Sequence, residues 1–165
     1  MLFRSGIVSS EEKRAFVHRA GIEHVLIRGK DDVRGRVMAL TGGRGADVVY
    51  AMAGPGAAFV ANLDLLAPLG TVVSFSMLGG PIPDADLYGE LRKRAGHSLG
   101  VRVYSIHTLD HEPVLRRSLM ERAIELMAAG RLRPPPPTAL PLAEAARAHE
   151  MMEASRTLGK IILVP

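Results

Sequence analysis

Short apolar runs alternate with helix-like segments along the whole chain of 165 residues. Apolar, strand-like stretches occupy residues 2–8, 24–27, 47–51, 71–76, 100–106 and 160–164. Segments with apolar residues every three or four positions separate most of them. This alternation is typical of a parallel sheet, because each parallel connection has to cross a face of the sheet and usually does so as a helix. The sequence therefore predicts an α/β fold, as a single domain over residues 1–165.

Polar residues and glycines indicate where the expected helices begin and end. Ser9 and Glu12 have the spacing of a capping box, in which the serine hydroxyl and the glutamate carboxylate bond free amides of the first turn. A later helix that carries Leu66 is expected to end at Gly70. Residues 42–45, Gly-Gly-Arg-Gly, follow a helix and precede a strand. They predict a turn, because a phosphate-binding loop follows a strand and opens a helix.

The composition argues against several classes of function. The net charge is +4, but Lys and Arg are interspersed with Asp and Glu, and the chain has four Phe, three Tyr and no Trp. We therefore expect no nucleic-acid partner. The absence of Cys excludes disulfides and thiolate metal sites, and the one H-x-x-x-H pair, His107 and His111, is expected in a loop. With no long apolar run and no signal peptide, we predict a cytoplasmic protein without a membrane or a metal partner.

Several sequence segments resemble one known family. They are LTGGRGADVV at 40–49, LAPLGTVVSF at 66–75, PLAEAARAH at 141–149 and GKIIL at 159–163. Together they are similar, in order and in spacing, to the zinc-free, quinone-oxidoreductase-like medium-chain dehydrogenases. The resemblance implies a Rossmann-like, doubly wound parallel sheet that binds NADP(H). It also implies an oxidoreductase that transfers hydride to a quinone or an activated C=C bond.

The resemblance covers only part of the family's enzyme. Its first strand and glycine-rich loop would precede Leu2, and its GroES-like catalytic domain would precede those. We therefore expect an incomplete Rossmann-like domain, the cofactor-binding portion of an NADPH-dependent oxidoreductase, which is inactive alone. In the strand order 3-2-1-4-5-6 the first strand is central. Strands 2–8 and 47–51 would therefore either close on each other or leave two unpaired edges.

Four residues after the first two expected strands are candidates for binding the phosphate of NADP. Ser9, Ser10 and Lys13 follow the first strand, where NAD-specific relatives usually place an acidic residue. Arg28 follows the next strand and could bind the same phosphate in a bidentate manner. The alternatives are that Ser9 only caps the helix and that Lys13 and Arg28 are solvated.

The resemblance implies two more cofactor contacts, both altered in this chain. Ala51-Met52-Ala53-Gly54 replaces the family pattern DSVG, so only Ala53 and Gly54 keep the small residues that let the cofactor approach. Phe75, Ser76 and Met77 align with an FGN turn whose backbone meets the nicotinamide. Ser76 in place of glycine restricts that turn. These departures predict that NADP(H) binding is weakened.

The segment from Val101 to Ile106 corresponds to the strand through which the family forms dimers, so a homodimer is expected. An ordinary edge strand is the alternative. Arg156 lies near a basic position of the family, and we interpret it as a surface residue. Two other functions stay open. One is a non-catalytic binding or dimerisation module that pairs with a separate catalytic half. The other is a fragment related to polyketide-type enoyl reductase modules.

Overall fold

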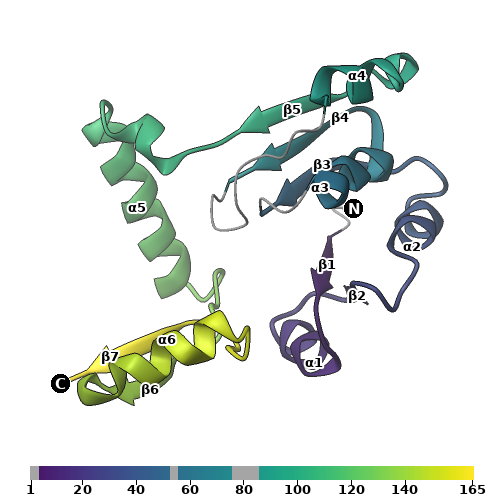
Figure 1. The fold of residues 1–165 in the computed structure, drawn as a ribbon. Helices are drawn as coiled ribbons and strands as arrows, with labels where there is room; N and C mark the ends of the chain where they lie inside the picture. The colour runs from purple at the N-terminus through teal and green to yellow at the C-terminus, as the bar shows by residue number, and fades with distance from the viewer. Residues whose placement is uncertain (1–3, 53–55, 76–85) are drawn as a thin grey trace. The chain divides into compact units, whose positions relative to one another are not determined.

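The computed structural model describes residues 4–52, 56–75 and 86–165. The chain divides into two compact units, which are residues Met1–Lys30 with Met120–Pro165 (unit 1) and residues Asp31–Leu119 (unit 2). Every strand pairing in the described residues is parallel (Figure 1). The predicted α/β class and parallel pairing are thereby confirmed. Among the described residues, no helix is long and apolar enough to span a membrane.

Unit 1 contains two parallel strand pairs. Strand β1 (Ser5–Val8) pairs with β2 (His24–Ile27), and helix α1 (Glu11–Arg19) connects them. Strand β6 (Thr138–Pro141) pairs with β7 (Ile161–Val164). The short 3-10 helix η4 (Leu142–Glu144) and helix α6 (Ala145–Glu153) connect this second pair. Each pair is thus a strand–helix–strand unit, which is the building block of a doubly wound sheet.

The start of α1 differs from the expected capping box. Ser10, not Ser9, is the N-cap, and its hydroxyl oxygen accepts a hydrogen bond of 3.3 Å from the backbone amide of Lys13. Ser10 has the extended backbone that an N-cap requires, with φ −154° and ψ 164°. The third residue of the helix is therefore Lys13 and not Glu12, so the reciprocal carboxylate bond does not form. The hydroxyl of Ser9 is not used as the cap.

Unit 2 contains a three-stranded sheet in the order β3-β4-β5. Its strands are β3 (Ala46–Ala51), β4 (Leu66–Ser74) and β5 (Gly100–Val103), and its α-helices before α5 are α2 (Val33–Leu40), α3 (Gly56–Ala61) and α4 (Leu87–Arg92). Short 3-10 helices lie at Asn62–Leu65 (η1), Ala95–His97 (η2) and Ile106–Leu109 (η3). The long helix α5 (Pro113–Ala128) includes residues of both units.

The core of unit 2 lies on one face of this sheet. Phe59 and Leu63, which follow β3 in the chain, pack with Leu66 and Val72 of β4. Leu63 and Val72 are almost completely buried, at 1% and 0% exposure. Tyr50 of β3 is not part of this core, and its side chain is exposed. Within unit 2, the residues packed on this core alternate along the strands and share one face.

Strands β1 and β3 lie in different units of the chain. Strands β1 and β3 belong to separate sheets, and among the described residues each pairs with a single neighbour, β2 and β4.

The prediction that a helix carries Leu66 and ends at Gly70 is wrong. The helical segment ends at Leu65, and β4 begins at Leu66, five residues earlier than expected. Pro68 has no backbone amide and biases the residue before it towards extended backbone. Ala46 pairs with Leu66, but Val48 pairs with Thr71, so β4 contains a bulge between the two pairs. Within this bulge Leu69 is in the left-handed region, with φ 65°.

Replacing Leu69 with glycine is expected to stabilise unit 2 by about 1 kcal/mol, because a left-handed backbone costs an L-residue roughly 1–2 kcal/mol and glycine almost nothing. The side chain of Leu69 is 79% exposed, so little packing is lost. Urea unfolding of the two proteins measures the difference. The matched control is Leu69→Ala, which keeps the strained Cβ and should leave stability close to that of the wild type. Equal stability of the glycine and alanine variants would contradict the prediction.

Arg94 connects two segments of unit 2 through a polar network. Its Nε donates to Asp64 Oδ1 at 2.9 Å, and its Nη1 donates to both the backbone oxygen and Oε2 of Glu90 at 2.8 Å. Lys93 Nζ donates to the other oxygen of Glu90 at 2.6 Å. Hydrogen bonds from Lys93 and then from Arg94 hold the pKa of the Glu90 carboxyl below its usual value of 4.5. The ionised form of Glu90 therefore stabilises the folded state.

The contribution of Glu90 to stability is expected to be lost in acid. A carboxyl whose pKa is lower in the folded than in the unfolded chain contributes its full stabilisation above pH 4.5 and loses it as the pH falls through the folded pKa. The measurement compares urea midpoints of the wild type and Glu90→Gln between about pH 7 and about pH 3. Their difference should shrink below pH 4.5. A difference that does not change with pH would refute the role of ionisation.

Candidate functional site

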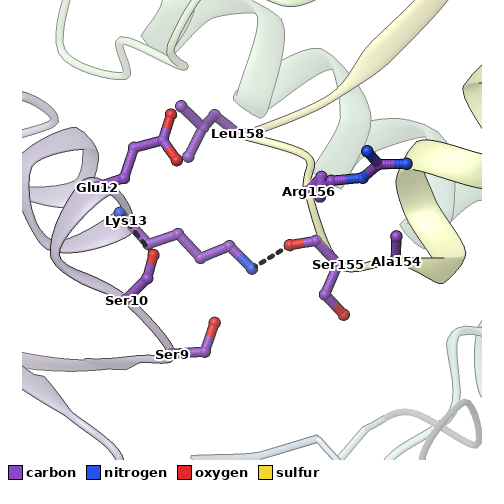
Figure 2. A pocket seen from close by; sticks show the side chains of 8 residues that line it. All are labelled: Ser9, Ser10, Glu12, Lys13, Ala154, Ser155, Arg156 and Leu158. Atoms are coloured by element: carbon purple, nitrogen blue, oxygen red, sulfur yellow. Dashed lines mark hydrogen bonds between the residues drawn. The ribbon is translucent and has the colours of Figure 1, made fainter.

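An open pocket in unit 1 lies between the start of α1 and the segment that follows α6 (Figure 2). Its volume is about 550 Å³. The residues that line it are Ser9, Ser10, Glu12, Lys13, Ala154, Ser155, Arg156 and Leu158. Three of the four residues predicted to bind the NADP phosphate therefore meet in one pocket. The fourth, Arg28, does not line it.

The first side of the pocket is built by the junction of β1 and α1. Ser9 and Ser10 follow Val8 directly, so they stand at the carboxyl end of a parallel strand, where doubly wound folds bind their ligands. Ser10 caps α1, and the Ser9 hydroxyl is directed towards the pocket (Figure 2). The amides of the first helical turn and the N-terminal end of the helix dipole favour an anion here.

The second side is built by the end of α6. The amide of Ser155 donates to Met152 O at 3.0 Å, and that of Arg156 donates to Met151 O at 2.9 Å. These two bonds, with Ser155 at φ 53°, form a Schellman motif that ends the helix and reverses the chain. Arg156 is thereby placed at the pocket. The sequence had led us to interpret it as a surface residue, and its side chain is indeed exposed, but it also lines the pocket.

The two sides are joined by a hydrogen bond from Lys13. Its Nζ donates to the backbone oxygen of Ser155 at 2.8 Å, across 142 positions of sequence (Figure 2). Lys13 is therefore not simply a solvated lysine on a helix surface. The pocket contains two cations, Lys13 and Arg156, and one carboxylate, Glu12. The balance of charge favours an anion, although Glu12 opposes it.

Arg28 is connected to the first side of this pocket by a backbone hydrogen bond and not by its side chain. Strands β1 and β2 are paired with Val8 opposite Ile27, and the amide of Arg28 donates to Val8 O at 2.9 Å. Ser9 and Arg28 thus follow neighbouring strands at the same edge. The side chain of Arg28 is exposed and is not among the lining residues. Its role as a phosphate ligand stays a prediction.

The expected nicotinamide contacts lie mostly outside the described residues. This applies to Ala53, Gly54, Ser76 and Met77. Phe75 is described: it follows β4 and is half exposed, and its amide approaches Ala51 O at 3.4 Å. Its predicted role remains untested.

Comparison with known proteins identifies the family. A profile described as zinc-binding dehydrogenase matches residues 20–163. A quinone oxidoreductase of Pseudomonas aeruginosa is 32% identical over 160 residues, which are 97% of this chain and 48% of that protein. The phthioceranic/hydroxyphthioceranic acid synthase of Mycobacterium tuberculosis is 32% identical over 162 residues, which are 92% of this chain and 7% of the synthase.

Solved structures give the same result. The structure of Escherichia coli quinone oxidoreductase complexed with NADPH matches with a TM-score of 0.86 and 28% identity, covering 98% of this chain and 49% of the other. This chain thus spans about half the length of the quinone oxidoreductases that it matches. The α/β, Rossmann-like fold predicted from the sequence is confirmed.

The family description includes zinc, but the side chains of the described residues do not fit a zinc site. The sequence has no cysteine. In the part of the chain that the structure describes, no group of three or more His, Asp or Glu side chains could hold a metal ion. The pocket instead offers cationic and hydroxyl groups, which suit an anion. The chain belongs to the zinc-binding dehydrogenase family and corresponds to the C-terminal, Rossmann-like half of its quinone oxidoreductases.

Proposed function

We propose that residues 1–165 are the cofactor-binding portion of an NADPH-dependent oxidoreductase of the quinone or enone reductase type. The observation that carries this proposal is the gathering of Ser9, Ser10, Lys13 and Arg156 in one pocket at the carboxyl end of β1. In doubly wound folds this edge binds the dinucleotide, and the adenosine ribose lies near the end of the second strand of the fold. The family resemblance makes β1 that strand.

The pocket residues suit the phosphate that distinguishes NADP from NAD. Lys13 and Arg156 supply positive charge, and charge-assisted hydrogen bonds to phosphate are stronger than those between neutral groups. Ser9 and Ser10 supply hydroxyl donors. Glu12 would repel the phosphate, in keeping with our expectation that the binding is weakened. The chain is therefore expected to prefer NADPH over NADH, with modest affinity for both.

The chemistry of the whole enzyme follows from the cofactor. When bound, the reduced nicotinamide supplies the hydride, and the protein contributes orientation and electrostatics. In this proposal the substrate pocket belongs to a GroES-like catalytic domain outside residues 1–165, and those residues alone turn over neither a quinone nor an enone. Turnover of a quinone with NADPH by the purified 165-residue chain would disprove that part of the proposal.

Thermal unfolding of the purified chain with millimolar NADPH or NADH tests the proposal. A ligand that binds only the native state raises its stability by mass action. The expected result is a cooperative transition that NADPH shifts upward more than NADH does. A transition that responds to neither cofactor would overturn the proposal for this chain.

A second candidate is the corresponding part of a polyketide-type enoyl reductase module. The similarity to the mycobacterial synthase favours it, because 92% of this chain aligns within a much larger polypeptide. The size of the native protein distinguishes a separate reductase from a module of a polyketide synthase. Antibodies against the chain should detect a polypeptide of ordinary dehydrogenase length or less in the first case, and a multidomain synthase in the second.

We also propose that the chain forms a homodimer through β5. This strand is at the edge of the sheet of unit 2, and Val103 and Tyr104 at its end are exposed. Exposed edge strands pair readily with one another, and a lysine on the edge prevents this. Light scattering should therefore show a dimer for the wild type and a monomer for Val103→Lys. A wild-type monomer would contradict the proposal, and so would an unaltered dimer in the variant.

A further inference from the structure

We propose that Ser155 is a positioning residue, whose left-handed backbone fixes the carbonyl oxygen that holds the Lys13 ammonium group for a phosphate. This inference rests on the proposed NADP(H) function of the pocket. It adds a determinant of cofactor preference that acts through Lys13.

The backbone of Ser155 is unusual and is held in place. Its φ of 53° lies in the left-handed region, which L-residues other than Asn and Asp seldom adopt. The amides of Ser155 and Arg156 donate to Met152 O and Met151 O, and these bonds compensate for the cost of that conformation. Glycine is the usual residue at this position of a Schellman motif, so a serine here carries strain.

The left-handed turn determines where the Ser155 carbonyl points. Figure 2 shows this oxygen facing the Lys13 ammonium group across the pocket, at 2.8 Å. A lysine side chain in water samples many rotamers, and holding it in one of them costs conformational entropy. The bond to Ser155 O restricts Lys13 before any ligand arrives, so that part of the entropy is already lost.

This bond leaves Lys13 able to bind an anion. An ammonium group has three N–H donors, and Ser155 O uses one of them. The remaining donors are available to phosphate oxygens in the pocket that Ser9 and Arg156 also line. Because the adenosine ribose of NADH carries no phosphate, the position of Lys13 should matter for NADPH and not for NADH.

The test compares two substitutions at position 155 in two backgrounds. Ser155→Gly keeps access to the left-handed conformation, and Ser155→Val resists it because a β-branched residue is strained there. Each is made in the wild-type chain and together with Lys13→Met. Isothermal titration calorimetry measures the affinities for NADPH and NADH, and circular dichroism with thermal unfolding verifies that each variant is folded.

We expect Ser155→Val to lower NADPH affinity about tenfold, which is the scale of one misplaced charge-assisted hydrogen bond, and to leave NADH affinity unchanged. Ser155→Gly should bind both cofactors with wild-type affinity. With Lys13→Met present, Ser155→Val should lower NADPH affinity clearly less, because only the placement of Arg156 by the same turn can then still change. If a folded Ser155→Val protein keeps the wild-type ratio of affinities, or loses NADPH affinity equally in both backgrounds, the inference is overturned. Absence of NADPH binding by the wild type would instead refute the proposed function on which the inference rests.

Discussion

Lys13→Met is expected to lower NADPH affinity by about 10- to 100-fold and to leave NADH affinity unchanged. Hydrogen bonds to a charged group contribute roughly 1.5–3 kcal/mol each, and each 1.4 kcal/mol corresponds to a factor of about ten in affinity. Methionine keeps most of the length of the side chain and removes the charge. It also removes the bond from Nζ to Ser155 O, so both contributions of Lys13 are lost together. Calorimetric titration with the two cofactors measures the change.

The matched control for this prediction is Lys160→Met. Lys160 is in the same unit, is exposed, and does not line the pocket, so the same loss of one positive charge should change NADPH affinity much less. This comparison separates a local contact from a general effect of net charge, which acts on any anionic ligand. If both variants lose NADPH affinity to the same extent, the pocket is not the phosphate site.

Leu63→Ala is expected to destabilise unit 2 by about 2–5 kcal/mol. A buried leucine contributes the transfer free energy of its side chain, and its removal leaves a cavity that the surroundings fill only partly. Leu63 is 1% exposed and packs in the core with Phe59 and Val72. Stabilities of ordinary domains are about 5–15 kcal/mol, so this one change removes a large fraction of the total. Urea unfolding followed by circular dichroism measures it.

Leu115→Ala is the matched control for the core variant. Leu115 is also in unit 2 but is 46% exposed on α5, and alanine is as good a helix former as leucine. Its cost should therefore be near 0.5 kcal/mol, as for most surface substitutions. Equal costs for Leu63→Ala and Leu115→Ala would mean that η1 does not form the core described above.

The sequence predicted local structure well where one residue type determines it. Asp32 is of a residue type that favours N-caps, and its Oδ1 accepts the amide of Gly35 at the start of α2, at 2.9 Å. The turn at 42–45 forms as predicted, and its glycines at 42, 43 and 45 all have positive φ. Only glycine adopts such angles at little cost, so the sequence is informative there.

The sequence failed where neighbouring residues compete for the same role. Ser9 and Ser10 both suit an N-cap, and the capping-box spacing favoured Ser9, whereas the structure uses Ser10. At the end of the third helix, apolar spacing continued through Leu66, but the pairing of Leu66 with Ala46 places it in a strand. Helical periodicity and a short buried strand are difficult to distinguish, and tertiary pairing decides between them.

Local sequence patterns were enough to predict the α/β class and the parallel sheet, and to name Ser9, Ser10 and Lys13 as candidate ligands, because these inferences use residues close together in the chain. The placement of Arg156 and the Ser155 carbonyl in the same pocket could be seen only in the folded protein. The bond between Lys13 and Ser155 spans 142 positions, and no local pattern encodes such a contact. It exists because α1 and the Schellman turn after α6 are brought to the same place when unit 1 folds.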